Sequence, residues 1–195
     1  MKSLRLLSLL LVISLLLCAC GKKEPAKAEP VEDAVAEIVV KDYGTITVEL
    51  DGTAAPITVT NFVKLAKEGF YDSLTFHRIM AGFMMQGGDP DGNGSGGSDE
   101  TIVGEFSANG IENDLSQTRG AISMARTNDP NSASSQFFIV HEDSDFLDGQ
   151  YAAFGYVTEG IEVVDAICEA AQPIDNNGTI PAAAQPVIES ITIVE

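Results

Sequence analysis

The sequence has no tryptophan, two histidines and three cysteines among its 195 residues. Metal sites are built mostly from His and Cys ligands, and the chain beyond residue 20 offers only His77, His141 and Cys168. No G-x-S-x-G and no C-x-x-C pattern is present, which argues against a serine hydrolase and a thiol redox enzyme. We therefore expect no metal and no other cofactor.

Positive charge is also scarce. Eleven Lys and Arg stand against 29 Asp and Glu, which gives a net charge of −18. Nucleic acid binding requires a basic face, so a nucleic acid partner is not expected. The acidic surface is read as a solvated one that keeps the protein soluble. The length fits a single domain, and 18 glycines favour a turn-rich β protein over a helical bundle.

The N-terminus has the pattern of an export signal. Lys2 and Arg5 precede an apolar run over residues 6–17, which is typical of a signal peptide and shorter than the roughly 20 residues of a membrane span. The run ends in Leu17-Cys18-Ala19-Cys20, which resembles a bacterial lipobox. We expect a lipoprotein signal peptide over residues 1–19 and a lipid anchor at Cys20, outside the cytoplasmic membrane in a bacterial cell envelope. An ordinary cleaved signal and an uncleaved anchor are the alternatives.

Residues 20–36 are expected to be a lipidated cysteine followed by a disordered tether. The tether is expected because this stretch is rich in Pro, Lys, Glu and Ala and has no periodic apolar face. If Cys20 carries lipid, Cys168 has no partner, so no disulfide framework is expected. The folded domain is then expected over residues 37–195.

The domain has the hydrophobic pattern of many short strands and two isolated helices. Residues 45–50 alternate strictly, and Pro56 opens a helix with apolar residues at i, i+3, i+4 and i+7. A second helix is expected over residues 160–171. Such a pattern suggests a closed antiparallel barrel with helices over its ends. The other strands are expected at residues 37–40, 75–78, 83–86, 121–124, 136–140, 154–157 and 187–194.

The acidic loop over residues 89–100 matches the calcium-binding pattern of an EF-hand at each fixed position. A strand precedes it and no helix follows, so calcium binding is not expected. The loop also contains G-x-G-x-x-G, but no helix follows to bind phosphate and its carboxylates would repel it. It is read as a flexible glycine-rich loop beside the site.

One arginine and one glutamine stand in the apolar segment over residues 76–89. Arg78 and Gln86 are placed to be the polar groups of a mostly apolar pocket, the usual form of a small-ligand site. His77 directly precedes Arg78, so in a regular strand it is expected to point away from the site.

Three motifs resemble the cyclophilin family of peptidyl-prolyl isomerases, and the resemblance spans nearly all the chain after residue 36. The pattern F-H-R-x-x-x-G-F-x-x-Q-G-G-D begins at Phe76, S-x-x-S-Q-F-F-I begins at Ser132, and L-D-G begins at Leu147. The resemblance implies a mainly β fold, a closed eight-stranded antiparallel barrel with two helices covering its ends. It also implies a site without nucleophile, metal or acid–base pair.

Carried over by position, Arg78 is the catalytic arginine and Gln86 its polar companion. Phe146 stands where many eukaryotic members have Trp, which should weaken cyclosporin binding, and Tyr151 stands where they have His. The residues that the resemblance places against the substrate are Phe83, Met84, Gly94, Ser95, Ala125, Arg126, Gln136, Phe138, Phe146, Leu147 and Tyr151.

We therefore expect a peptidyl-prolyl cis-trans isomerase that acts on proline-containing unfolded or exported polypeptides, as a monomer. The alternative is a non-catalytic proline-peptide binder or holdase chaperone that uses the same pocket. A solute-binding lipoprotein is disfavoured, because such proteins usually have two lobes and this chain has room for one.

Overall fold

The computed structural model describes residues 29–194. The expected signal peptide and Cys20 therefore lie outside the described residues. The described part contains eight strands and two α-helices, in the chain order expected from the sequence. They are β1 (Ala34–Val40), β2 (Gly44–Leu50), α1 (Pro56–Lys67), β3 (Thr75–Met80), β4 (Met84–Asp89), β5 (Ala121–Met124), β6 (Phe137–Val140), β7 (Ala153–Glu159), α2 (Ile161–Ala170) and β8 (Ile188–Val194).

The eight strands form one antiparallel sheet in the order β3-β4-β6-β5-β7-β2-β1-β8. The sheet curls until its two edges approach each other, and Thr75 of β3 bridges to Val187, just before β8. The Phe76 N–H donates to the Pro186 carbonyl at 2.9 Å beside this bridge. The expected eight-stranded fold is confirmed, with its edges joined by single bridges and not by a continuous ladder.

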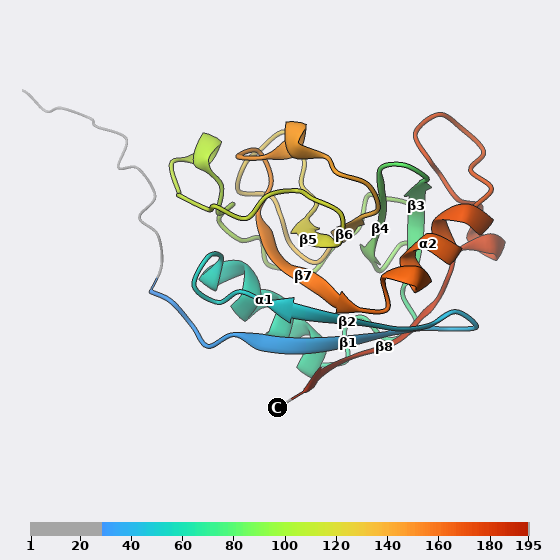
Figure 1. Ribbon diagram of the computed structural model, residues 1–195, viewed down its shortest axis with the longest axis horizontal. Coiled ribbons are helices and arrows are strands. Elements are labelled where there is room, and N and C mark those ends of the chain that lie inside the picture. Colours follow the sequence, from blue (N-terminus) through green and yellow to red (C-terminus); the bar gives the residue numbers. More distant parts are fainter. Residues whose placement is uncertain (1–28, 195) are drawn as a thin grey trace, which may run out of the picture.

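An aromatic cluster fills the inside of the curled sheet. Phe62 of α1 packs its ring against Tyr71, Phe137 and Phe154 at centroid distances of 5.1, 5.5 and 5.2 Å. The stripe of α1 that the sequence predicted, with Val59 and Phe62, is buried. Helices α1 and α2 cover different parts of the sheet (Figure 1). Because α1 carries a central ring of this core, it fixes the curl that holds β3, β4 and β6 together.

The first helix takes its N-terminal cap from a distant residue. Ala55 at the cap position provides no side-chain bond. Instead the fully buried carboxylate of Glu105 accepts the N–H of Ile57 at 3.0 Å and both the N–H and the hydroxyl of Thr58, at 2.8 and 2.7 Å. A carboxylate is favoured at a helix N-terminus, where N–H groups lack internal partners.

The first strand begins before the expected domain boundary. Strand β1 begins at Ala34, so residues 34–36, which the sequence analysis places in the tether, pair with β2. The Val31 N–H also donates to the Gly52 carbonyl at 2.9 Å. Within residues 29–194, neither helix has the length and apolar character needed to cross a bilayer.

Candidate functional site

A small cavity of about 190 Å³ opens where β3, β4 and β6 meet the loops after β5 and β6. It lies below the usual range of small-molecule sites, about 300–1,000 Å³, so it suits one residue of a longer chain. Met84 and Phe138 form its buried apolar wall. Nine residues singled out from the sequence line it together: Arg78, Phe83, Met84, Gln86, Ala125, Arg126, Phe138, Leu147 and Tyr151.

Arg78 is held at this cavity from two sides. Its Nε donates to the Asn177 carbonyl at 2.7 Å, and its Nη1 donates to Gln86 Oε1 at 3.1 Å. Gln86 lies directly opposite Arg78 in the β3–β4 register, so the two strands present both groups on one face. Burial lowers the pKa of Arg78, with Tyr151 and Asp175 acting against that change; an arginine stays charged all the same. The result is a fixed cation beside an apolar wall.

A chain of side-chain amides extends from Arg78 across the site. Gln86 Nε2 donates to Gln136 Oε1 at 2.8 Å, and Gln136 Nε2 donates to the Gly96 carbonyl at 2.7 Å. Each amide therefore uses one donor and one acceptor within the chain, which fixes its orientation. This links the arginine on β3 to the glycine-rich loop.

That loop is organised by one buried carboxylate. Asp89 is 1% exposed, and its oxygens accept the N–H groups of Asp91 at 2.8 Å and Asn93 at 3.1 Å, together with that of Gly94. Burial raises the pKa of Asp89, but these backbone donors and Gly96 outweigh it, so the pKa lies below its ordinary value. The first acid of the EF-hand-like pattern is thus engaged by its own loop.

Arg126 and Tyr151 form the opposite side of the cavity. Arg126 donates through Nε and Nη2 to the Gln150 carbonyl at 3.0 and 2.8 Å. Its guanidinium also lies 4.7 Å from the centroid of the Tyr151 ring, which meets Phe138 edge-on at 5.8 Å. Tyr151 therefore keeps an aromatic wall where the family resemblance implies His.

Four of the predicted substrate contacts lie outside the small cavity. Gly94, Ser95 and Gln136 line a neighbouring hollow of about 300 Å³, which shares Gln86, Ala125 and Arg126 with the cavity. Phe146 lines neither. It is 64% exposed and stacks on Phe83 at 5.8 Å, at the rim.

The expectation for His77 is wrong in its geometry. The β3–β4 register passes from Phe76 opposite Gly87 to Arg78 opposite Gln86, so His77 is an extra residue in a bulge. A bulge re-aims side chains, and His77 lines a hollow together with Arg78 and Gln86. It is not part of the apolar cavity, but it does not point away from the site.

Asn177 is the site residue that sequence reasoning missed. Its carbonyl holds Arg78, yet it lies 99 positions away. Asp175 shapes the turn by accepting the N–H groups of Asn177 at 2.9 Å and Thr179 at 3.0 Å. The run Asp-Asn-Asn-Gly over residues 175–178 signals a turn, but no local pattern shows that this turn meets β3.

Among residues 29–194, we find no metal-binding cluster and no reactive thiol at this cavity. Within residues 29–194, no group of three or more His, Cys, Asp or Glu is placed to hold a metal ion. Cys168 is buried, and burial raises the pKa of its thiol to about 12, so it is not a ready nucleophile. His141 lies near Asp165, 3.3 Å from Nε2 to Oδ1, and accepts the Gly82 N–H through Nδ1; neither contact involves the cavity.

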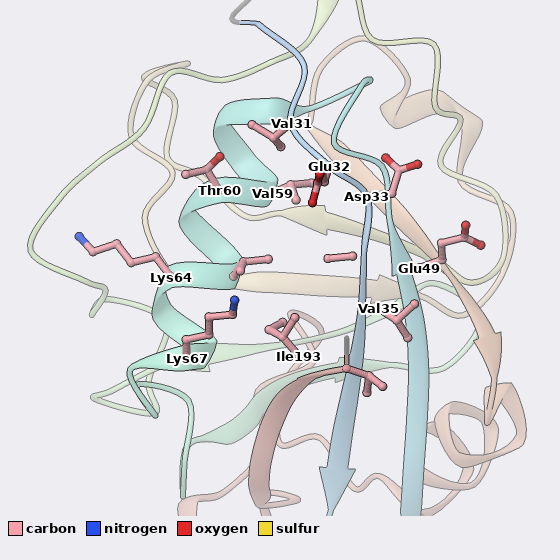
Figure 2. Close-up of a pocket in the computed structure, with 13 residues that line it drawn as sticks. Val31, Glu32, Asp33, Val35, Glu49, Val59, Thr60, Lys64, Lys67 and Ile193 are labelled. Atoms are coloured by element: carbon pink, nitrogen blue, oxygen red, sulfur yellow. The ribbon is translucent and has the colours of Figure 1, made fainter.

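A larger hollow of about 820 Å³ lies between α1 and the strands β1 and β8. Figure 2 shows aliphatic side chains such as Val59 and Ile193 inside it, while Lys64 extends away from it. This hollow has no fixed cation or amide of the kind that marks the small cavity. Size alone therefore does not identify the site.

The comparisons with known proteins agree with this geometry. Residues 35–193 match the family model described as cyclophilin-type peptidyl-prolyl cis-trans isomerase/CLD. Peptidyl-prolyl cis-trans isomerase B of Bacillus subtilis is 48% identical over 124 residues, which cover 64% of this chain and 83% of that protein. A peptidyl-prolyl cis-trans isomerase of Helicobacter pylori is 41% identical over 143 residues, 72% of this chain and 85% of that protein.

A solved structure shows the same fold. The cyclophilin-type peptidyl-prolyl cis-trans isomerase of Cryptosporidium parvum, crystallised in the presence of the dipeptide Ala-Pro, has a TM-score of 0.72 at 30% identity. The match covers 83% of this chain and 99% of that one. The chain belongs to the cyclophilin family of peptidyl-prolyl cis-trans isomerases.

Proposed function

We propose that this protein accelerates cis–trans exchange of X-Pro bonds in exported polypeptides, and that Arg78 stabilises the twisted amide. The observation that carries the proposal is a guanidinium held by two separate hydrogen bonds in a cavity of single-residue size that has an apolar wall. The relative crystallised with Ala-Pro supports a proline-containing ligand.

The chemistry of the amide bond explains why such a cation suffices. Rotation is resisted by the partial double bond, with a barrier of about 18–20 kcal/mol. At the twisted transition state the prolyl nitrogen regains its lone pair and becomes a better acceptor. A fixed guanidinium near that nitrogen binds the transition state more strongly than the planar ground state, and only such differential binding accelerates a reaction.

The fixed amides serve the same step. The proline ring rests against Met84 and Phe138 while the preceding carbonyl swings, and Gln86 keeps Arg78 in place or holds that carbonyl. No bond to the enzyme forms, so no nucleophile is needed. The alternative is a proline-peptide binder or holdase with the same cavity; it has less need of a doubly anchored arginine.

Exchange of a short X-Pro peptide, followed by a protease-coupled assay, tests the proposal. Removing an ionic hydrogen bond of about 1.5–3 kcal/mol should lower kcat/KM for Arg78→Ala by roughly 10- to 150-fold. Arg78→Lys should lose most of this rate too, because one amine cannot hold the Asn177 carbonyl and Gln86 in the same fork. Lys64→Ala, which removes an exposed cation on α1, is the control.

Binding of the peptide should be measured beside its turnover. Peptide binding without any acceleration by the wild-type protein would establish the binder instead. Full activity in a folded Arg78→Ala protein would refute the role of the arginine.

We further propose that the protein is a lipoprotein, anchored through Cys20 outside the cytoplasmic membrane of a bacterial envelope. The basic start, the short apolar run and the lipobox-like Leu17 and Ala19 support this. Stable attachment needs at least two lipid chains. Cys20→Ser should release the protein or block its processing, and mass spectrometry that finds an unmodified Cys20 in the membrane fraction would overturn the anchor.

A further inference from the structure

A second hollow adjoins the proline cavity on the side of Arg78. It has a volume of about 360 Å³ and shares Arg78 and Gln86 with the cavity. Its other walls come from β3, the glycine-rich loop and the turn before β8. Unlike the cavity, it is lined mainly by polar side chains, among them His77, Asn93, Asn177 and Thr179.

The His77 side chain in this hollow lacks hydrogen bonds. His77 is 4% exposed, and neither of its ring nitrogens has a hydrogen-bond partner among residues 29–194. Buried polar atoms are nearly always bonded, because leaving one unbonded costs free energy. The bulge at His77 brings the ring to this position, so the strand departs from its regular register to place two unpaired nitrogens here.

Gly94 lies over the ring on the side of the loop. A Cβ built at position 94 would lie 3.6 Å from His77 Nε2, so a side chain there would pack directly against that nitrogen. The nearby Asp89 carboxylate cannot serve as a partner in its present arrangement, because its oxygens are bonded to backbone N–H groups.

The ring is neutral at ordinary pH. Burial lowers the pKa of His77, Asp89 acts against that change and Arg78 acts with it. A neutral imidazole has one N–H donor and one acceptor nitrogen. A carboxylate on the ligand could not donate to the acceptor nitrogen of the ring. An ammonium could not accept from the ring N–H, and Arg78 would repel it. A side-chain amide or a hydroxyl can both donate and accept.

We propose that this hollow is a second substrate site, in which His77 selects a side-chain amide or hydroxyl on a residue that flanks the proline. The inference rests on the proposed isomerase function, since the hollow reaches the substrate only if the proline occupies the cavity beside Arg78. Asn177 and Thr179 complete the polar lining.

Two series of X-Pro peptides test the proposal, one varied before the proline and one after it. Asn is compared with Leu, which has nearly the same shape without donor or acceptor, and Gln with Met. In one of the series the amide peptide should have a kcat/KM about two- to tenfold above its apolar counterpart, the gain expected from one hydrogen bond. His77→Phe keeps a flat ring without nitrogens and should bring that ratio close to one.

Asn177→Ala is a second variant, since it trims the hollow but keeps the backbone carbonyl that holds Arg78. It should lower the ratio, whereas Asn176→Ala, the adjacent residue that does not line the hollow, should leave it unchanged. If His77→Phe does not fold, the Asn177→Ala ratio decides.

The inference fails if both series show no preference for the amide, or if the preference survives in folded His77→Phe. Absence of turnover with every peptide would instead refute the proposed function.

Discussion

Replacing Asp89 by Asn should loosen the glycine-rich loop and weaken the site without touching a predicted substrate contact. Asp89 accepts several backbone N–H groups with its two oxygens. Asn keeps one of these oxygens and places an NH₂ group where the other stood. That group faces N–H donors and cannot accept from them.

The structure sets the size of the effect. Hydrogen bonds to a charged group contribute about 1.5–3 kcal/mol each, and two such bonds would be lost. Asn93 and Gly94 are exposed, so their freed N–H groups can turn to water and recover part of the loss. Two such bonds correspond to about 3–6 kcal/mol, and because part of this is recovered we expect the free energy of unfolding to fall by about 2–3 kcal/mol. The Gly96 carbonyl of this loop accepts a hydrogen bond from Gln136, which is bonded to Gln86. A looser loop should therefore disturb the site, and kcat/KM should fall as well.

Denaturant unfolding measures this difference, and its pH dependence tests the cause. Asp89 has a lowered pKa in the folded state, so its contribution is full above the unfolded value, near 3.9. It is lost as the pH falls through the lower folded value. The stability gap between wild type and Asp89→Asn should therefore close below about pH 4.

Asp99→Asn, which changes an exposed acid in the same loop, is the matched control and should be close to neutral. Equal stability of Asp89→Asn and Asp99→Asn at pH 7 would refute the reasoning.

Three further outcomes are expected. Cyclosporin should inhibit weakly, and Phe146→Trp should strengthen inhibition, because an indole N–H at the exposed rim restores a donor; equal inhibition of both forms would show that Phe146 is misassigned. Titration calorimetry should detect no tight, stoichiometric calcium binding at residues 89–100, and a one-to-one site would contradict the interpretation of this loop. Glu105→Gln should lower the free energy of unfolding by about 1.5–3 kcal/mol, because the helix cap loses an acceptor, whereas Glu112→Gln, at an exposed position, should change it little.

The sequence predicted the parts of the site that depend on local periodicity. Arg78 and Gln86 stand in adjacent strands joined by a short turn, so their pairing follows from the hairpin. The family resemblance placed Phe138 and Tyr151 in the same cavity, where the structure has them. Their roles in turnover stay predictions until the variants are measured.

The parts that could not be predicted depend on register and on distant contacts. The position of His77 follows from a bulge in β3. Opposite this bulge, Gly87 lies so close to β3 that a Cβ would come within 2.8 Å of the Thr75 carbonyl. The alternation of side chains along a regular strand cannot predict where such an extra residue is inserted. Asn177 and Glu105 act on partners 99 and about 48 positions away, and local propensity carries no information on such contacts.

The pairing of the first strand with the last decides when this protein can fold. β1 meets β8 along a register that starts at Val35 opposite Val194. While the chain leaves the ribosome, the β1–β2 hairpin has no outer neighbour, and an isolated hairpin is marginally stable in water. The cap of α1 is likewise missing until Glu105 has been made. The sheet can be completed only once β8 has been synthesised, so a chain that stops within β8 leaves β1 without its outer neighbour.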